Sequence, residues 1–126
     1  MSELACLELS VLLWLVHLFC QAGLSGRPHA WLISARDEPA PALKLTPIGG
    51  RAARAFSNYM ESFPVFAALD LAFIATRHPA GIWPALWIVT RIAYLPLYLA
   101  GAPYGRSIVW GFSIAALVAM LIRLAL

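Results

Sequence analysis

Charged and polar side chains recur at helical spacing inside segments that are otherwise apolar. They are Arg54, Asn58, Glu61, Arg91, Tyr94, Tyr98, Arg106 and Ser107. Ionised side chains at membrane depth are costly, so they usually face a protein interior or a polar cavity and have partners there. A surplus of guanidinium groups suits an anionic, carboxylate-bearing ligand, because arginine offers paired donors. The sequence therefore predicts a polar binding pocket inside an apolar protein.

The composition predicts the elements that must hold this pocket. The chain has 126 residues, of which 62% are hydrophobic and only 12% are charged. A water-soluble domain of this size buries too little surface to hide so much apolar material, so its solvent must be largely lipid. Four apolar stretches have the roughly 20 residues that a helix needs to cross a bilayer: 4–24, 52–76, 82–100 and 108–126. We expect one domain, residues 1–126: an all-α membrane protein with a bundle of four transmembrane helices.

The connections between these stretches predict their directions. Residues 78–81 and 101–105 form short turns rich in glycine and proline, so successive helices should be antiparallel neighbours. The one long connection runs from Ser25 to Gly50 and should be irregular, with Gly49 and Gly50 marking the start of the second helix. Pro64 and Pro96 fall inside the second and third helices, where membrane bundles tolerate them.

Basic residues are distributed unevenly between the two ends of the predicted bundle. Those on one side are Arg27, Arg36, Lys44, Arg51 and Arg106, against Arg77 and Arg123 on the other. The positive-inside rule places the richer side in the cytoplasm. We therefore expect a multi-pass integral membrane protein with both termini outside the cytoplasm. Topology accounts for the net charge of +3, so no nucleic-acid partner is expected.

The depths of two opposite charges suggest an ion pair. Counting 1.5 Å per residue from the cytoplasmic side puts Glu61 about 15 Å deep and Arg91 about 18 Å deep. We expect the two to pair, within one chain or between chains, with Asn58 and Tyr94 as hydrogen-bond partners. Arg106 should then lie at the mouth of a pocket that opens to the cytoplasm. For the pair alone, an architectural role in fixing helix register is an equal alternative.

Other candidate residues suggest ordinary packing. Cys6 and Cys20 have neither CxxC nor metal-site spacing, so both should pack as small hydrophobic residues, and no metal is expected. His17 should be a packed histidine. Asp70 has no polar neighbour at helical spacing and is expected at the membrane interface. A lone carboxylate at Glu8 is a candidate proton site.

The motifs, taken in order, resemble the MAPEG family, membrane-associated proteins in eicosanoid and glutathione metabolism, and a bacterial-type member of it. Residues 51–66 resemble its Arg-Ala, Asn, Glu and Pro-x-Phe pattern. Residues 91–98 and 106–107 resemble its elements in the third and fourth helices, and residues 33–36 resemble the stretch that follows the first helix in one branch.

This resemblance implies a homotrimer with glutathione sites between subunits. It implies a membrane glutathione transferase or peroxidase that acts on lipophilic electrophiles from the bilayer, with glutathione as co-substrate. Arg106 would be the catalytic residue that stabilises the glutathione thiolate. The glutathione-binding residues would be Arg36, Arg54, Asn58, Glu61, Arg91, Tyr94, Tyr98 and Ser107.

Two departures from the family pattern keep alternatives open. Trp110 stands where the enzymes commonly carry a tyrosine, and Asp37 follows Arg36 where one branch has a second arginine. One alternative is a non-catalytic membrane protein that keeps a ligand pocket. Another is a small proton-coupled transporter that uses Glu8 or Glu61. The nearby arginines disfavour the transporter, because they would hold the carboxylate in its charged form.

Overall fold

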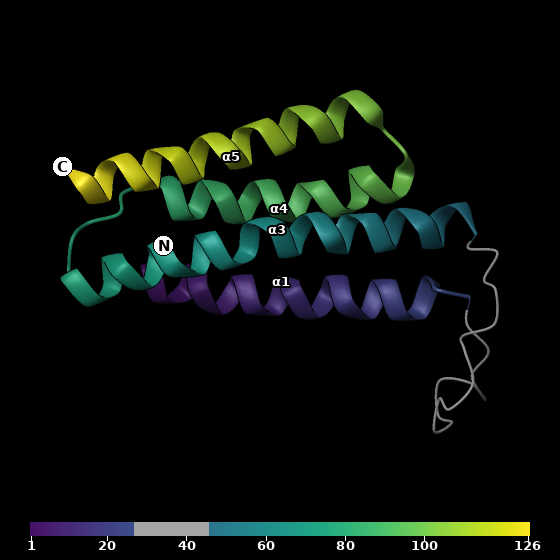
Figure 1. Ribbon diagram of the computed structural model, residues 1–126, viewed down its shortest axis with the longest axis horizontal. Helices are drawn as coiled ribbons and strands as arrows, with labels where there is room; N and C mark the ends of the chain where they lie inside the picture. The colour runs from purple at the N-terminus through teal and green to yellow at the C-terminus, as the bar shows by residue number, and fades with distance from the viewer. Residues whose placement is uncertain (27–45) are drawn as a thin grey trace, which may run out of the picture.

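Four helices make up the part of the chain that the structure describes. The structure is a computed structural model, and it describes residues 1–26 and 46–126. The helices are α1 (Glu3–Leu24), α3 (Pro47–Thr76), α4 (Trp83–Ala100) and α5 (Pro103–Ala125), with no strand in these two ranges. Figure 1 shows successive helices running in opposite directions, with both termini at the end that carries the α3–α4 turn. The predicted all-helical, antiparallel fold is confirmed.

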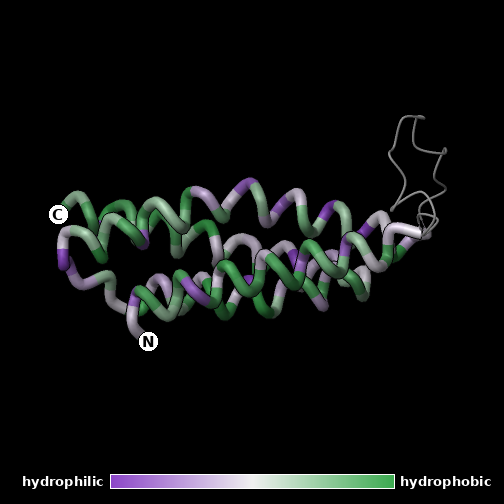
Figure 2. The backbone as a smooth tube through the Cα atoms, turned by 90° about the horizontal axis from the view of Figure 1, so that it is seen from below, coloured by the Kyte–Doolittle hydropathy of each residue, from purple (hydrophilic) through white to green (hydrophobic). Residues whose placement is uncertain are grey.

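Three of the helices have the length and apolar character to cross a membrane, namely α1, α3 and α5. Figure 2 shows that apolar residues occupy most of the helical length. Large apolar side chains such as Phe19 and Phe112 are exposed on the outer surface, as expected where lipid is the solvent. The prediction of four spanning helices is thus confirmed for three. The fourth, α4, contains Arg91 and several prolines and aromatic residues.

Two helices begin earlier than the apolar stretches predicted. The hydroxyl of Thr46 accepts a hydrogen bond from the Gly49 amide at 3.2 Å, and Pro47 occupies the first turn of α3. A threonine cap followed by proline is a strong start signal for a helix. Pro103 likewise begins α5, at 103 rather than 108. Because these first turns are polar, a hydropathy profile does not detect them. Gly49 and Gly50 therefore lie inside α3, where the sequence had suggested a break before the helix.

The bundle consists of two closely packed helix pairs, α1 with α3 and α4 with α5. Contacts of α3 with α4, α1 with α4 and α3 with α5 join the two pairs, and those between α3 and α4 are the most extensive. In the described ranges, α1 and α5 do not contact each other. The joint is aromatic: Phe66 of α3 stacks on Trp87 of α4, with ring centroids 4.0 Å apart. Tyr59 of α3 donates a hydrogen bond to the Ser10 carbonyl of α1 at 2.6 Å. These contacts between α1, α3 and α4 fix the helices that carry the polar residues.

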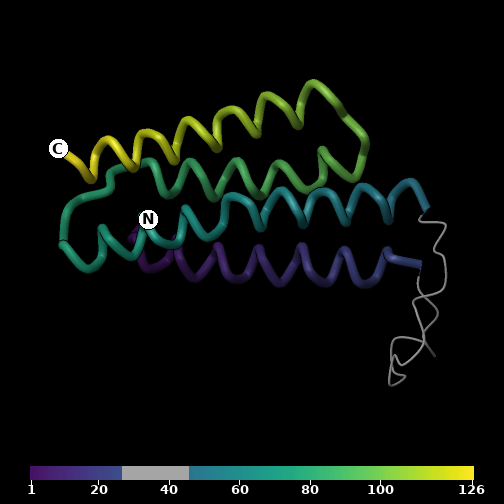
Figure 3. Tube along the Cα trace, viewed as in Figure 1, coloured from purple at the N-terminus to yellow at the C-terminus, as the bar shows by residue number. Residues whose placement is uncertain are grey.

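Two arginines tie the ends of the bundle together. At one end, Arg51 Nη1 donates to the Leu99 carbonyl at 3.0 Å, next to Gly101, which ends α4 in a left-handed conformation (φ 75°). At the other end, Arg123 Nε donates to the Pro79 carbonyl at 2.7 Å. Between these ends α3 continues through Pro64 and changes direction along its length (Figure 3).

A close approach between α1 and α3 makes Gly49 sensitive to substitution. Gly49 is buried, and a Cβ atom there would collide with the backbone carbonyl oxygen of Leu24. We expect Gly49→Ala to lower the free energy of unfolding by about 1–3 kcal/mol, because a backbone atom cannot move aside cheaply. Gly111, also helical, has open space around it. Gly111→Ala should therefore stabilise by up to about 1 kcal/mol. The melting temperatures of the two variants in detergent, measured by circular dichroism, test this expectation. Equal melting temperatures would contradict the close approach of Gly49 to the Leu24 carbonyl.

Candidate ligand pocket

A polar pocket lies near the α4–α5 turn, between α3, α4 and α5. Its volume is about 220 Å³, and its lining residues are Asn58, Tyr94, Tyr98, Arg106, Ser107 and Trp110. Three different helices contribute these side chains, so no single segment builds the pocket. Five of the six are residues that the sequence predicts to bind or activate a ligand. The geometry therefore brings the central part of the predicted site together within one chain.

The guanidinium group of Arg106 is held over an aromatic ring. Its Cζ atom lies 4.7 Å from the ring centroid of Tyr98, a cation–π distance. Tyr98 in turn packs against Tyr94, with ring centroids 5.4 Å apart and ring planes tilted by 55°. The Arg106 side chain has no hydrogen bond or ion pair with any described residue. Its donors are thus oriented by the ring and available to an anion.

Arg91 lies behind the pocket and fixes Asn58. It is fully buried, with 0% of its surface exposed. Its Nη1 donates to Asn58 Oδ1 at 2.9 Å, and its guanidinium lies between the rings of Trp87 and Tyr94. Because Oδ1 accepts this bond, the amide NH₂ is the group that Asn58 has left for the pocket. The pocket wall therefore offers an amide donor, a guanidinium, a serine hydroxyl and two phenols.

The sequence matches the MAPEG family over residues 4–126. The chain belongs to the MAPEG family. No curated protein and no solved structure matched it. Membership, together with three helices of spanning length and apolarity, makes the chain an integral membrane protein.

In this MAPEG protein the expected ion pair between Glu61 and Arg91 does not form within the described part of the chain, where Arg91 bonds Asn58 instead. Glu61 is exposed. The reason is rotational: Tyr59 faces the core, and Glu61, two residues later, lies about 160° around the helix from it. The prediction compared the depths of Glu61 and Arg91, and it did not consider the face of α3 on which Glu61 lies. A pair between chains remains a prediction.

Two other predicted binding residues, Arg54 and Arg91, do not line the pocket. Arg54 is exposed on α3, and Arg91 lies behind the pocket, where it contacts two lining residues, Asn58 and Tyr94. Arg36 lies outside the described residues. Arg54 and Glu61 are separated by seven residues, about two helical turns, and so share one outer face of α3.

Some residues of this MAPEG protein were placed differently by sequence reasoning. Asp70 is fully buried, and neither carboxylate oxygen has a hydrogen-bond partner in the described ranges, so this residue faces the interior of the bundle. Its expected depth near the membrane interface stays a prediction. His17 is a buried histidine, as expected, and its ring packs 4.4 Å from that of Tyr59. Cys6 is buried in the core and Cys20 is half-buried, and both are free thiols. Trp110 lines the pocket, although its sequence position marks it only as a departure from the family pattern.

Proposed function

We propose that this MAPEG protein is a glutathione-dependent membrane transferase or peroxidase whose thiolate is stabilised by Arg106. The observation that carries this proposal is the guanidinium of Arg106, which is oriented by the Tyr98 ring and paired with no described residue, in a pocket with Asn58 and Ser107. Glutathione carries two carboxylates, an ammonium group and a thiol. A pocket with surplus positive charge and several neutral donors suits such a ligand.

The chemistry requires a thiolate, because the ionised form of a thiol is the nucleophile. A fixed guanidinium close to sulfur favours ionisation at neutral pH. In the transferase reaction, the thiolate forms a bond to an electrophilic carbon, and the thiol proton leaves to solvent. The displaced group, or the electron pair of an activated double bond, takes the remaining charge. The electrophile would be a lipophilic molecule, since the partly exposed indole of Trp110 lines the pocket on a helix long and apolar enough to span a membrane.

We propose further that the complete site forms between subunits of a homotrimer. The pocket of one chain, at about 220 Å³, is smaller than most ligand pockets, which hold roughly 300–1,000 Å³. Arg54 and Glu61 are exposed on α3, and α1, which packs beside α3, exposes Glu8. Exposed ionised groups along apolar helices are costly in lipid, so a second copy of the chain is the natural cover. Glu61 would then suit the ammonium group of glutathione and Arg54 a carboxylate.

Glutathione binding to the purified, detergent-solubilised protein tests this proposal directly. Calorimetry should show glutathione binding. Asn58→Ala should weaken this binding about tenfold, because the side-chain amide donor that faces the pocket is lost. The matched control is Ser57→Ala, since Ser57 is exposed on the same helix and does not line the pocket. The ultraviolet absorbance of the thiolate should appear when wild-type protein binds glutathione near neutral pH. Absence of binding would reject the proposal.

A non-catalytic, ligand-binding MAPEG protein is the second candidate, and one observation favours it. Trp110 lines the pocket and brings an indole where the family's enzymes commonly have a tyrosine hydroxyl. The same experiment separates the two candidates. Glutathione binding without a thiolate signal would favour the non-catalytic protein, and binding with the signal would favour the enzyme.

A further inference from the structure

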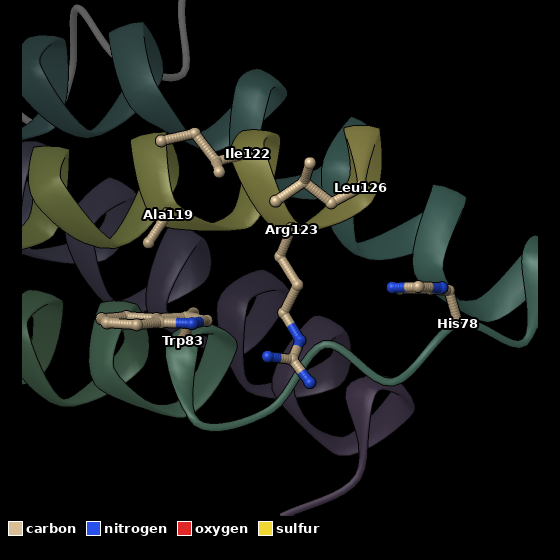
Figure 4. Close-up of a pocket in the computed structure, with 6 residues that line it drawn as sticks. All are labelled: His78, Trp83, Ala119, Ile122, Arg123 and Leu126. Atoms are coloured by element: carbon tan, nitrogen blue, oxygen red, sulfur yellow. The ribbon is translucent and has the colours of Figure 1, made fainter.

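A second pocket lies at the opposite end of the bundle, beside both termini. Its volume is about 420 Å³, and its lining residues are His78, Trp83, Ala119, Ile122, Arg123 and Leu126. Figure 4 shows the Arg123 side chain extending from α5 between Trp83 and His78. None of these residues belongs to the pocket of Arg106. The proposed glutathione chemistry therefore does not account for this second site.

The guanidinium of Arg123 is held in place by the turn between α3 and α4. Its Nε donates to the Pro79 carbonyl at 2.7 Å, and the two terminal nitrogens have no hydrogen-bond partner elsewhere in the described ranges. Gly81 lies against it: a Cβ atom there would be only 3.6 Å from Cζ. No aspartate or glutamate lines the pocket. One side of the guanidinium is thus anchored, and the other offers paired donors to an anion.

Apart from Arg123 and His78, the lining side chains are apolar or aromatic, and the pocket lies at the expected height for a membrane interface. Trp83 is the first residue of α4, and Arg123 lies in the last turn of α5. Tryptophan is enriched where hydrocarbon meets headgroups, and arginine near helix ends reaches toward the same level. Ala119 and Ile122 continue the wall along α5 toward the centre of the bundle. An acyl chain has an apolar surface to follow from this point.

We propose that this pocket binds an anionic phospholipid, with the phosphate on Arg123 and the first part of an acyl chain against Trp83, Ala119 and Ile122. A pocket at headgroup level that is lined by Arg123 and by no aspartate or glutamate side chain favours a lipid with net negative charge over a zwitterionic one. The pocket volume suits a headgroup with the upper part of one chain. This inference does not depend on the proposed enzyme function.

Native mass spectrometry of the detergent-solubilised protein, titrated with phosphatidylglycerol or phosphatidylcholine, tests the site. Wild type should retain phosphatidylglycerol preferentially, and Arg123→Gln should weaken that binding about tenfold through loss of the paired donors. Arg77→Gln is the matched control, because Arg77 is exposed at the same end and does not line this pocket. Equal weakening by both variants, or equal retention of the two lipids by wild type, would overturn the proposal.

Two further arms keep the test decisive if Arg123→Gln disturbs the fold. Ala119→Trp fills the apolar wall and leaves Arg123 in place, so it should also reduce phosphatidylglycerol retention several-fold. Unchanged retention by this variant would show that the acyl chain does not use the pocket. Glycerol phosphate, a headgroup without chains, should compete at least a hundredfold more weakly than the lipid. Equal competition would identify a soluble phosphate site and overturn the assignment to a lipid.

Discussion

Replacing Arg106 with leucine is expected to lower the turnover of glutathione conjugation by on the order of 100-fold, the usual loss when a charge-stabilising donor is removed. The ring of Tyr98 holds this guanidinium 4.7 Å away, and no described residue neutralises it. The apparent pKa of the bound glutathione thiol should rise by about one unit or more, toward its free value near 8.5. Titration of thiolate absorbance against pH measures the shift, and the calorimetric affinity for glutathione should fall much less than turnover.

Two variants separate this role from a general effect of charge. Arg106→Lys keeps a cation but loses the planar group that packs on Tyr98, so its thiol pKa should lie between those of wild type and Arg106→Leu. Arg77→Leu removes an arginine from the other end of the bundle and should leave turnover unchanged. If Arg106→Leu left the thiol pKa where it is in wild type, Arg106 would not be the stabilising group.

Replacing Asn58 with leucine is expected to destabilise the bundle by about 3–5 kcal/mol, because it leaves Arg91 buried without its only described hydrogen-bond partner. Arg91→Met, which removes the charge and roughly keeps the volume, should cost far less. The double variant Asn58→Leu with Arg91→Met should therefore recover most of the lost stability. Unfolding in denaturant gives the three free-energy differences. Additive losses would contradict the pairing of Asn58 with Arg91.

A second double-mutant cycle, with Glu61→Leu and Arg91→Met, measures the coupling free energy of the pair that the predicted depths suggested. Within one chain Glu61 is exposed and Arg91 is fully buried, so coupling should be near zero in the monomer. Coupling that appears only in the assembled oligomer would place the carboxylate of one chain near the guanidinium of another. Strong coupling in the monomer would instead show that Glu61 reaches Arg91 within one chain.

Sequence reasoning reached the helices and much of the pocket for identifiable physical reasons. Hydropathy follows burial in lipid, so the four apolar stretches coincide with the helices apart from their polar first turns. Tyr94 and Tyr98 could be placed together because spacing of four residues fixes a shared face on one helix. The short connection between α4 and α5 then places Arg106, in the first turn of α5, at the same end of the bundle as Tyr98.

The remaining errors concern how each helix is rotated about its own axis relative to its neighbours. Hydropathy and residue spacing in a single sequence do not determine this rotation. Which face of α3 meets α4 depends on the packing of Tyr59 and Phe66 against Trp87. That packing turns Asn58 toward Arg91 and Glu61 away from it. The burial of Asp70 has the same origin, because it follows Phe66 by four residues and thus lies on the core face. An apolar stripe through residues 59, 66 and 73 was available as a signal for this direction.

Trp110 lines the Arg106 pocket and is 43% exposed, so one wall of the pocket is an indole at the surface of a helix long and apolar enough to span a membrane. A lipophilic electrophile would reach the thiolate by lateral diffusion within the bilayer. The concentration that governs its rate is then its mole fraction in the membrane, set by its partition coefficient. At a fixed total amount of substrate, adding inert lipid dilutes it in two dimensions, so the apparent KM expressed per volume rises with lipid content. The KM for glutathione, which arrives from water, stays constant over the same series.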